Sequence, residues 1–121
     1  MEIKFRGFSI ENNCWIYGFY HEVEVEGIRN AYIFWQGESW NVDNKSVGMS
    51  TGLIDKNKIR MYSGDIVKHE YEFGKGLGEI VYYPPSFKLD DGKATCDDFT
   101  WEDWEDFEVI GNTYENSNLI N

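Results

Sequence analysis

A catalytic pair of nucleophile and base would need a serine, threonine or cysteine near a histidine. The histidines are His21 and His69, and the cysteines are Cys14 and Cys96. Both histidines lie beside alternating strand residues, which favours a packed or surface imidazole over a base paired with a nucleophile. Cys96 lies in an acidic loop that disfavours the reactive thiolate, and Cys14 lies in an apolar strand. The pattern predicts no catalytic residues and no disulfide between the two cysteines.

Carboxylates are the abundant reactive groups, with 22 Asp and Glu against 11 Lys and Arg. The densest run comprises Asp97, Asp98, Glu102, Asp103, Glu105 and Asp106. This run lacks the alternating oxygen ligands and central glycine of an EF-hand loop. A pair of carboxylates in a cleft, as in glycosidases, remains an open alternative. The sequence therefore predicts no metal site and no cofactor.

Residues 74–78 contain three glycines in five positions, a composition shared with phosphate-binding loops. The Gly-Lys-Ser/Thr triplet of such loops does not follow, and no helix is predicted there. The segment is therefore predicted to be a flexible hairpin loop.

Net charge and apolar patterning restrict the partners. The formal net charge is −11, so phosphate would repel the surface and nucleic-acid binding is disfavoured. No apolar run approaches the roughly 20 residues of a membrane span, and residues 1–6 lack the apolar region of a signal peptide. Two cysteines are too few for a disulfide framework, which favours a reducing cytoplasm. We therefore expect a cytoplasmic protein that binds no membrane.

The elements that would position these groups are mostly strands. Residues 21–26 alternate valine and glutamate, which is typical of a half-buried antiparallel strand with both valines facing the core. Further strands are predicted at residues 4–8, 14–20, 28–35, 47–53, 66–73, 79–83 and 108–111. Residues 37–46 are predicted to be a loop. Around the turn at residues 62–65, Gly64 is expected at positive φ and Val67 in the core. The expected fold is a single domain over residues 1–121, mainly β, either barrel-like or a sandwich.

The pattern changes after Thr100. Trp101, Trp104 and Phe107 recur every three residues with acids between them, which predicts a short helix over residues 101–106 capped by Thr100. The aromatic stripe would dock on the strands, while the carboxylates would project away from them. The candidate protein-binding residues are Trp101, Glu102, Asp103, Trp104, Glu105 and Asp106. A plain solvated helix face explains the same pattern.

Three segments and the N-terminus together match a known pattern. They read VGMSTGLIDKN at residues 47–57, IRMYSGDIV at residues 59–67, VIGNTYEN at residues 109–116 and KFR at residues 4–6. In order and spacing, they resemble the YopX family of small phage and prophage proteins along nearly the whole chain. The chain departs from the family pattern at Phe8, Ser63 and Ser117. The resemblance implies a β-rich fold encoded by a phage or prophage, and it implies no activity.

Two functional hypotheses follow. The first is a non-enzymatic accessory protein that binds a bacterial host or phage protein through an acidic, aromatic surface. The second is a small carboxylate-using hydrolase or ligand-binding barrel. A homo-oligomer is compatible with either hypothesis. A pocket with two facing carboxylates would favour the second, and an exposed aromatic patch would favour the first.

Overall fold

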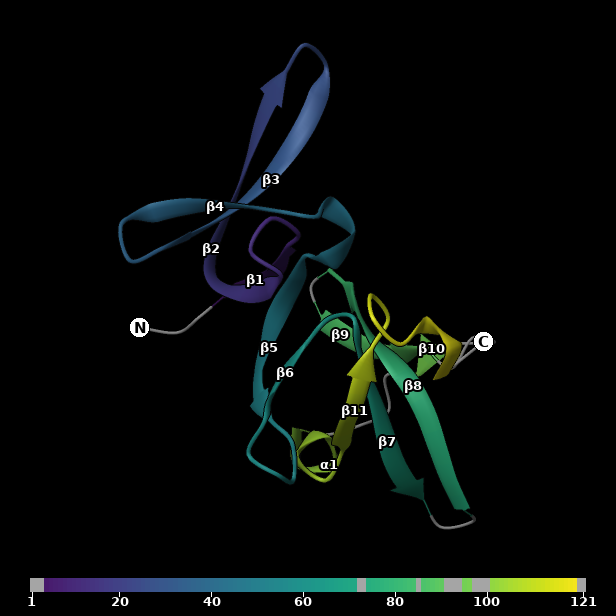
Figure 1. Ribbon diagram of the computed structural model, residues 1–121. Coiled ribbons are helices and arrows are strands. Elements are labelled where there is room, and N and C mark those ends of the chain that lie inside the picture. Colours follow the sequence, from purple (N-terminus) through teal and green to yellow (C-terminus); the bar gives the residue numbers. More distant parts are fainter. Residues whose placement is uncertain (1–3, 72–73, 85, 91–94, 97–100, 120–121) are drawn as a thin grey trace. The chain divides into compact units, whose positions relative to one another are not determined.

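The computed structural model describes residues 4–71, 74–84, 86–90, 95–96 and 101–119 (Figure 1). The chain divides into two compact units, Met1–Ser50 and Thr51–Asn121, which are considered in turn. Within the described segments, no helix has the length and apolar character needed to cross a membrane.

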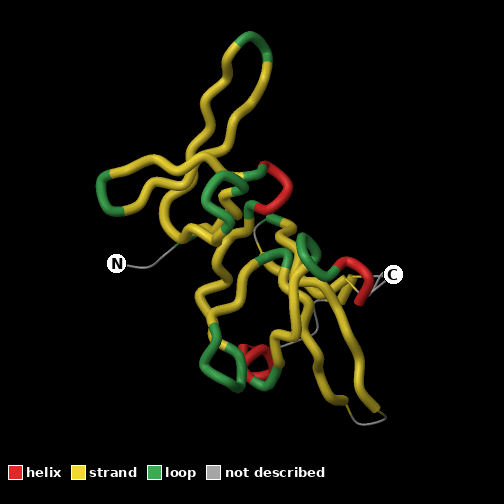
Figure 2. Tube along the Cα trace, in the orientation of Figure 1, coloured by secondary structure: helices red, strands yellow, loops and turns green. Residues whose placement is uncertain are grey.

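The first unit is an antiparallel sheet with the strand order β4-β3-β2-β1-β5. Adjacent strands are joined mostly by short turns (Figure 2). A 3-10 turn over Asn44–Ser46 precedes β5, and the Ser46 hydroxyl accepts a hydrogen bond from the Phe8 N–H at 2.7 Å. The strands are β1 (Phe5–Ser9), β2 (Cys14–Val25), β3 (Ile28–Trp35), β4 (Glu38–Val42) and β5 (Gly48–Ile54).

The core of the first unit is small. It consists of Ala31, Ile33 and Val42, with the partly buried side chains of Phe5, Ile16, Tyr20 and Val47 packed around them. Few side chains of this unit are fully buried, and much of β2 is exposed.

Two predictions for the first unit were wrong. The two strands predicted at residues 14–20 and 21–26 are one continuous strand, β2, which ends at Val25, because no turn residue lies at the junction of Tyr20 and His21. Residues 38–42 form β4 rather than a loop, since Gln36 and Gly37 both adopt positive φ, as a tight hairpin requires. The polar residues of β4 therefore belong to a solvated strand. The hairpin predicted at Gly27 is confirmed.

The second unit contains a five-stranded antiparallel sheet with the order β10-β9-β8-β7-β11. The end of β5 lies beside the short strand β6. A 3-10 turn spans Ser117–Leu119. The elements are β6 (Arg60–Tyr62), β7 (Asp65–Tyr71), β8 (Gly74–Tyr83), β9 (Ser86–Asp90), β10 (Thr95–Cys96), α1 (Trp101–Glu105) and β11 (Glu108–Asn112).

The core of the second unit joins the sheet to α1. Its buried members are Met61, Val67, Ile80, Leu89, Trp104 and Phe107. The helix predicted after Thr100 is confirmed and ends at Glu105, while Thr100 itself lies outside the described residues. Gly64 has φ 92° and Val67 is fully buried, so both predictions for that turn are confirmed.

The glycine-rich segment was predicted wrongly as a loop. Residues 74–78 open β8 and pair with β7, from Tyr71 opposite Gly74 to Val67 opposite Gly78. Glycine tolerates an extended backbone as well as a turn, and the ladder along β7 determines which conformation it adopts. The predicted end of the preceding strand at Phe73 lies outside the described residues.

The mainly β, antiparallel fold class is confirmed, with α1 as the α-helix of the described part of the chain. The five-stranded sheet ends in two edge strands, β10 and β11, so it is open rather than closed into a barrel.

Candidate functional site

The helix predicted as a contact surface lies at the edge of the second unit's core. Trp104 is buried, and its ring centroid lies 5.3 Å from that of Phe107. Asp103 and Asp106 are exposed and Glu105 is partly exposed. The side chains of Trp101 and Glu102 are outside the described set. Trp104 therefore anchors the helix, and the proposed contact role of the helix stays a prediction.

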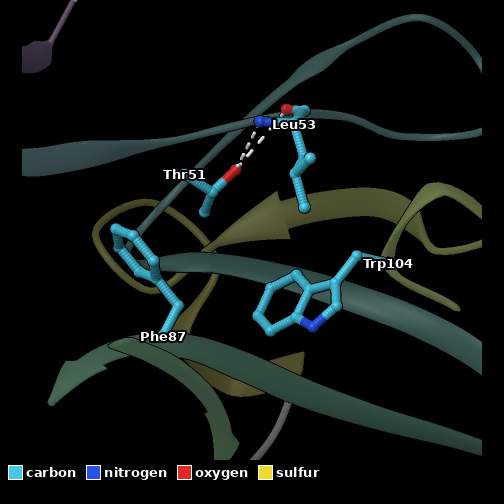
Figure 3. Close-up of a pocket in the computed structure, with 4 residues that line it drawn as sticks. All are labelled: Thr51, Leu53, Phe87 and Trp104. Carbon is cyan, nitrogen blue, oxygen red and sulfur yellow. Dashed lines mark hydrogen bonds between the residues drawn. The ribbon is translucent and has the colours of Figure 1, made fainter. Parts of the chain in front are cut away.

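Next to this helix lies an apolar pocket of about 170 Å³. Thr51, Leu53, Phe87 and Trp104 line it (Figure 3). The Thr51 hydroxyl accepts a hydrogen bond from the Leu53 N–H at 3.1 Å and donates one to the Met61 carbonyl at 3.0 Å. None of the four described residues that line the pocket carries an acidic or basic side chain, so these four supply no acid or base.

Two carboxylates face each other elsewhere in the second unit. Glu79 on β8 is directly opposite Asp90 on β9. Burial raises the pKa of Glu79, and the negative charge of Asp90 raises it further. Neither residue lines the pocket of Figure 3. The arrangement is a like-charge pair on a sheet rather than a pair aimed into that cavity.

This pair leads to a prediction for Glu79→Gln. The raised pKa means that the folded chain binds more protons than the unfolded chain just above the ordinary glutamate pKa. The wild type should therefore lose stability as the pH rises through that window. The variant should gain about 0.2–1 kcal/mol in unfolding free energy at pH 7, the usual cost of like charges opposite each other on strands. The gain should vanish below the ordinary glutamate pKa.

Urea unfolding across this pH range would test the prediction. Glu38→Gln, at an exposed position of β4, is the control for removing one negative charge. An equal gain in both variants would mean that overall charge, not the Asp90 contact, sets the effect.

In the first unit, β2 and β3 extend past their neighbours. The register of β1 with β2 ends where Phe5 pairs with Gly18, and that of β4 with β3 ends where Val42 pairs with Ala31. The pairing of β2 with β3 continues to Val25 opposite Ile28. Among the described strands, the end of this hairpin is thus a two-stranded ribbon, visible in Figure 1 as the long hairpin of β2 and β3.

One face of this hairpin is mostly apolar and exposed to solvent, with Asn30 opposite Val23 as a polar member. Side chains on a strand alternate between faces, and directly paired residues share a face. The exposed fractions of Val25 and Ile28 reach 55% and 65%. We call this set the apolar ribbon face: Tyr17, Phe19, Val23, Val25, Ile28 and Phe34, all exposed.

The stacked rings of His21 and Tyr32 lie in the middle of this face. Their centroids are 5.3 Å apart, and the planes differ by 18°. A ring nitrogen of His21 lies 3.1 Å from the Ser39 hydroxyl on β4. His21 therefore has a packing role, as its alternating neighbours indicated.

The opposite face of the ribbon is charged. Glu22 and Glu24 are exposed there, and Arg29 lies opposite Glu24 and 4.0 Å from a Glu22 oxygen. The Tyr20 hydroxyl donates to Glu22. Burial and the Glu22 carboxylate raise the pKa of Tyr20 to about 12, so its hydroxyl stays protonated as a donor. With Glu26 in the turn, the ribbon carries three exposed glutamates.

An aromatic groove of about 440 Å³ also belongs to this unit. Trp15, Ile16, Tyr17, Trp35 and Trp40 line it. Tyr17 contributes to both the groove and the apolar ribbon face. Trp40, which was predicted in a polar loop, lies on β4 instead. The exposed apolar surface therefore continues from the ribbon into the groove.

Sequence reasoning missed this surface because it placed Val23 and Val25 in a half-buried strand. They are exposed, because they lie on the face of β2 opposite the one that carries the core residues Ala31 and Ile33. The register of β1 also ends before them. The signal for a long strand was available: residues 14–25 contain no Pro, Asn or Asp, whereas the predicted strand at residues 4–8 is short. A strand that is much longer than its neighbours must extend beyond them.

Comparison with known proteins supports the fold. The model of the family described as YopX protein matches residues 4–121. A search of curated proteins finds no significant match. Protein EF1440 from Enterococcus faecalis has a crystal structure with a TM-score of 0.58 at 20% identity, covering 100% of this chain and 99% of that one. Protein yopX from Bacillus subtilis gives 0.59 at 17% identity, covering 100% and 98%. At such identities, the similarity shows a shared fold.

Proposed function

The chain belongs to the YopX protein family, and we propose that it is a non-enzymatic protein-binding module. In this proposal it is a phage or prophage accessory protein that acts in the host cytoplasm. The observation that carries the proposal is the apolar ribbon face, in which exposed aliphatic and aromatic side chains follow one another along the hairpin.

The free-energy cost of exposing apolar side chains to water supports a partner for this face. Each Å² of apolar surface left in water forgoes about 25 cal/mol. Soluble monomers rarely expose large contiguous apolar patches, and those they expose are often binding sites. A two-stranded hairpin is marginally stable alone, so a partner that covers it would also stabilise it. Tyr17, Phe19 and Phe34 supply the aromatic side chains that act as anchors in protein interfaces.

Charge defines the class of partner. The chain carries a formal net charge of −11, and the ribbon presents Glu22 and Glu24 on the face opposite its apolar residues and Glu26 in its turn. A basic protein would be attracted toward such a surface, and salt would weaken that attraction. The proposed partner is therefore a host or phage protein with a basic, partly apolar surface.

The carboxylate-based alternative has one observation in its favour, the raised pKa of Glu79 opposite Asp90. Perturbed carboxylates in a pocket are typical of hydrolases. These two carboxylates are not among the residues that line the pocket of Figure 3. The apolar ribbon face is exposed to solvent along the hairpin, so the binding function is the proposal we favour.

Site-specific photocrosslinking in the host cell tests the proposed function. A photoreactive residue at position 25 should capture a specific partner, while one at Lys58, an exposed position of the second unit, should not. The double change Val25→Ser and Ile28→Ser should reduce co-purification of the same protein by at least about tenfold, the loss expected for about 1.4 kcal/mol.

Equal capture at positions 25 and 58, or unchanged co-purification by the serine variant, would contradict the proposal. Both serine positions are exposed, so the variant should unfold at nearly the same urea concentration as the wild type.

A further inference from the structure

We propose that the outer edge of β2, from Tyr20 to Val25, accepts an added β-strand from a partner segment in which basic and apolar residues alternate. This inference rests on the proposed function and names its binding mode. Strand addition is a common mode of peptide recognition, in which backbone hydrogen bonds supply affinity and alternate side chains supply specificity.

The first support is the open edge. β2 pairs with β3 on one side along residues 19–25. On the other side its partner is β1, and that register stops at Gly18. In the part of the chain that the structure describes, no strand pairs with the outer side of residues 20–25. Such a row of backbone groups is a template for another strand.

The turn determines which backbone groups point outward. Glu26 and Gly27 have φ of 53° and 80°, the positive values of a two-residue hairpin turn. Val25 and Ile28 close this turn as a hydrogen-bonded pair. Hydrogen-bonded and non-bonded pairs alternate along an antiparallel ladder, so Val23 bonds to β3 whereas Glu24 and Glu22 do not. The N–H and C=O groups of Glu22 and Glu24 therefore face the open edge.

The side chains along this edge specify the occupant. Glu22 and Glu24 lie on one face of β2, and Val23 and Val25 lie on the other. A strand laid against β2 would place alternate side chains beside each row. Lysine or arginine beside the glutamates and apolar residues beside the valines would complement both.

A second copy of this chain fits the edge poorly. Two β2 strands paired edge to edge would bring glutamate rows together on one face or set glutamates beside valines. Like charges directly opposite each other destabilise a sheet, and the two chains together carry twice the net charge of −11. A basic segment from another protein is therefore the occupant that the edge favours.

A short capped peptide in which valine and lysine alternate is the probe. Amide hydrogen exchange is measured on the full-length protein. Nonspecific electrostatic binding of the peptide would not slow exchange at particular amides. On adding the peptide, the amides of Glu22 and Glu24 should exchange about tenfold more slowly, because they become hydrogen-bonded. The amide of Val23, already bonded to β3, is the internal control. A block peptide with all lysines at one end should bind more weakly and protect neither glutamate.

Two variants separate backbone pairing from charge. Glu24→Gln keeps the outward N–H and should weaken peptide binding about two- to fivefold with a flatter salt dependence. Glu24→Pro also removes the outward N–H and should weaken binding by a further factor of about five to ten. Proline is tolerated at such positions because the missing N–H faces solvent. Should the proline variant misfold, a peptide N-methylated at alternate amides tests the same bond on the unaltered protein.

The outcomes distinguish this inference from the proposed function. Peptide binding without protection of Glu22 and Glu24, or equal binding by the glutamine and proline variants, would overturn strand addition. If the crosslink at position 25 still captures a protein in that case, the binding function stands with a different mode. A dimer in sedimentation that Glu24→Pro dissociates would make a second copy the occupant and overturn the basic segment. If the crosslink at position 25 captures no protein and the peptide does not bind, both the binding function and strand addition are contradicted.

Discussion

Replacement of Asp55 with alanine is expected to lower the free energy of unfolding by about 3–5 kcal/mol, the largest single effect we predict. Hydrogen bonds to ionised groups contribute about 1.5–3 kcal/mol each, and this carboxylate makes three of them to backbone N–H groups. One oxygen accepts from Asn57 at 2.8 Å and Ile59 at 2.9 Å, and the other accepts from Val109 at 2.9 Å. Asp55 is only 2% exposed, so water cannot readily replace it.

The position of these bonds explains why the effect should be large. Residues 55–59 form the turn between β5 and β6, whereas Val109 belongs to β11, far along the sequence. The Lys56 N–H also donates to the Phe107 carbonyl, beside the same strand. Removing the carboxylate would leave partly buried donors in the turn and in β11 without an acceptor, so the turn and β11 would loosen together.

Urea denaturation of Asp55→Ala beside Lys56→Ala would measure this. Lys56 is exposed and forms a 3.8 Å ion pair with Glu108, so its loss should cost less than about 1 kcal/mol. If Asp55→Ala costs no more than Lys56→Ala, the carboxylate does not tie the turn to β11.

Replacement of Gly18 with alanine is expected to cost about 2–4 kcal/mol, because added volume in a packed position forces the backbone apart. A Cβ built on Gly18 would lie 2.3 Å from the Phe34 carbonyl oxygen on β3 and 3.1 Å from the Ile33 side chain. The first of these is backbone and cannot rotate away. The strands β2 and β3 would have to separate at the place where the ribbon leaves the sheet.

Gly78→Ala is the matched control for this change. Gly78 also lies in a strand, but its added Cβ would come no closer than 3.4 Å to another atom, the Asp90 carbonyl oxygen. Its stability should change by less than about 1 kcal/mol. Thermal unfolding of the two variants gives the comparison, and equal midpoints would show that β2 and β3 tolerate the Cβ without separating. Gly18→Ala should also weaken partner capture through the ribbon if the hairpin's orientation matters.

Local patterns in the sequence determined several features correctly. The Gly64 turn, the buried Val67, the hairpin at Gly27 and the short helix carrying Trp104 were predicted from residue types alone. Each depends on interactions within a few residues: a glycine that permits positive φ, or an aromatic spacing that matches a helical turn. The family resemblance was inferred from motifs spread over the chain, and the match of the family model to residues 4–121 confirms it.

Only the tertiary structure decided which face of a strand meets the core. The alternation at Val23 and Val25 indicates two faces correctly, but the core of Ala31 and Ile33 lies on the glutamate face, so the valines are exposed. The glycines of residues 74–78 became a strand because β7 offers them a ladder, a contact that their own composition does not specify. The same holds for Asp55, whose bond to Val109 joins residues far apart in the chain. Burial and long-range pairing arise from which segments meet, and the alternation of residues along one segment cannot specify its neighbour.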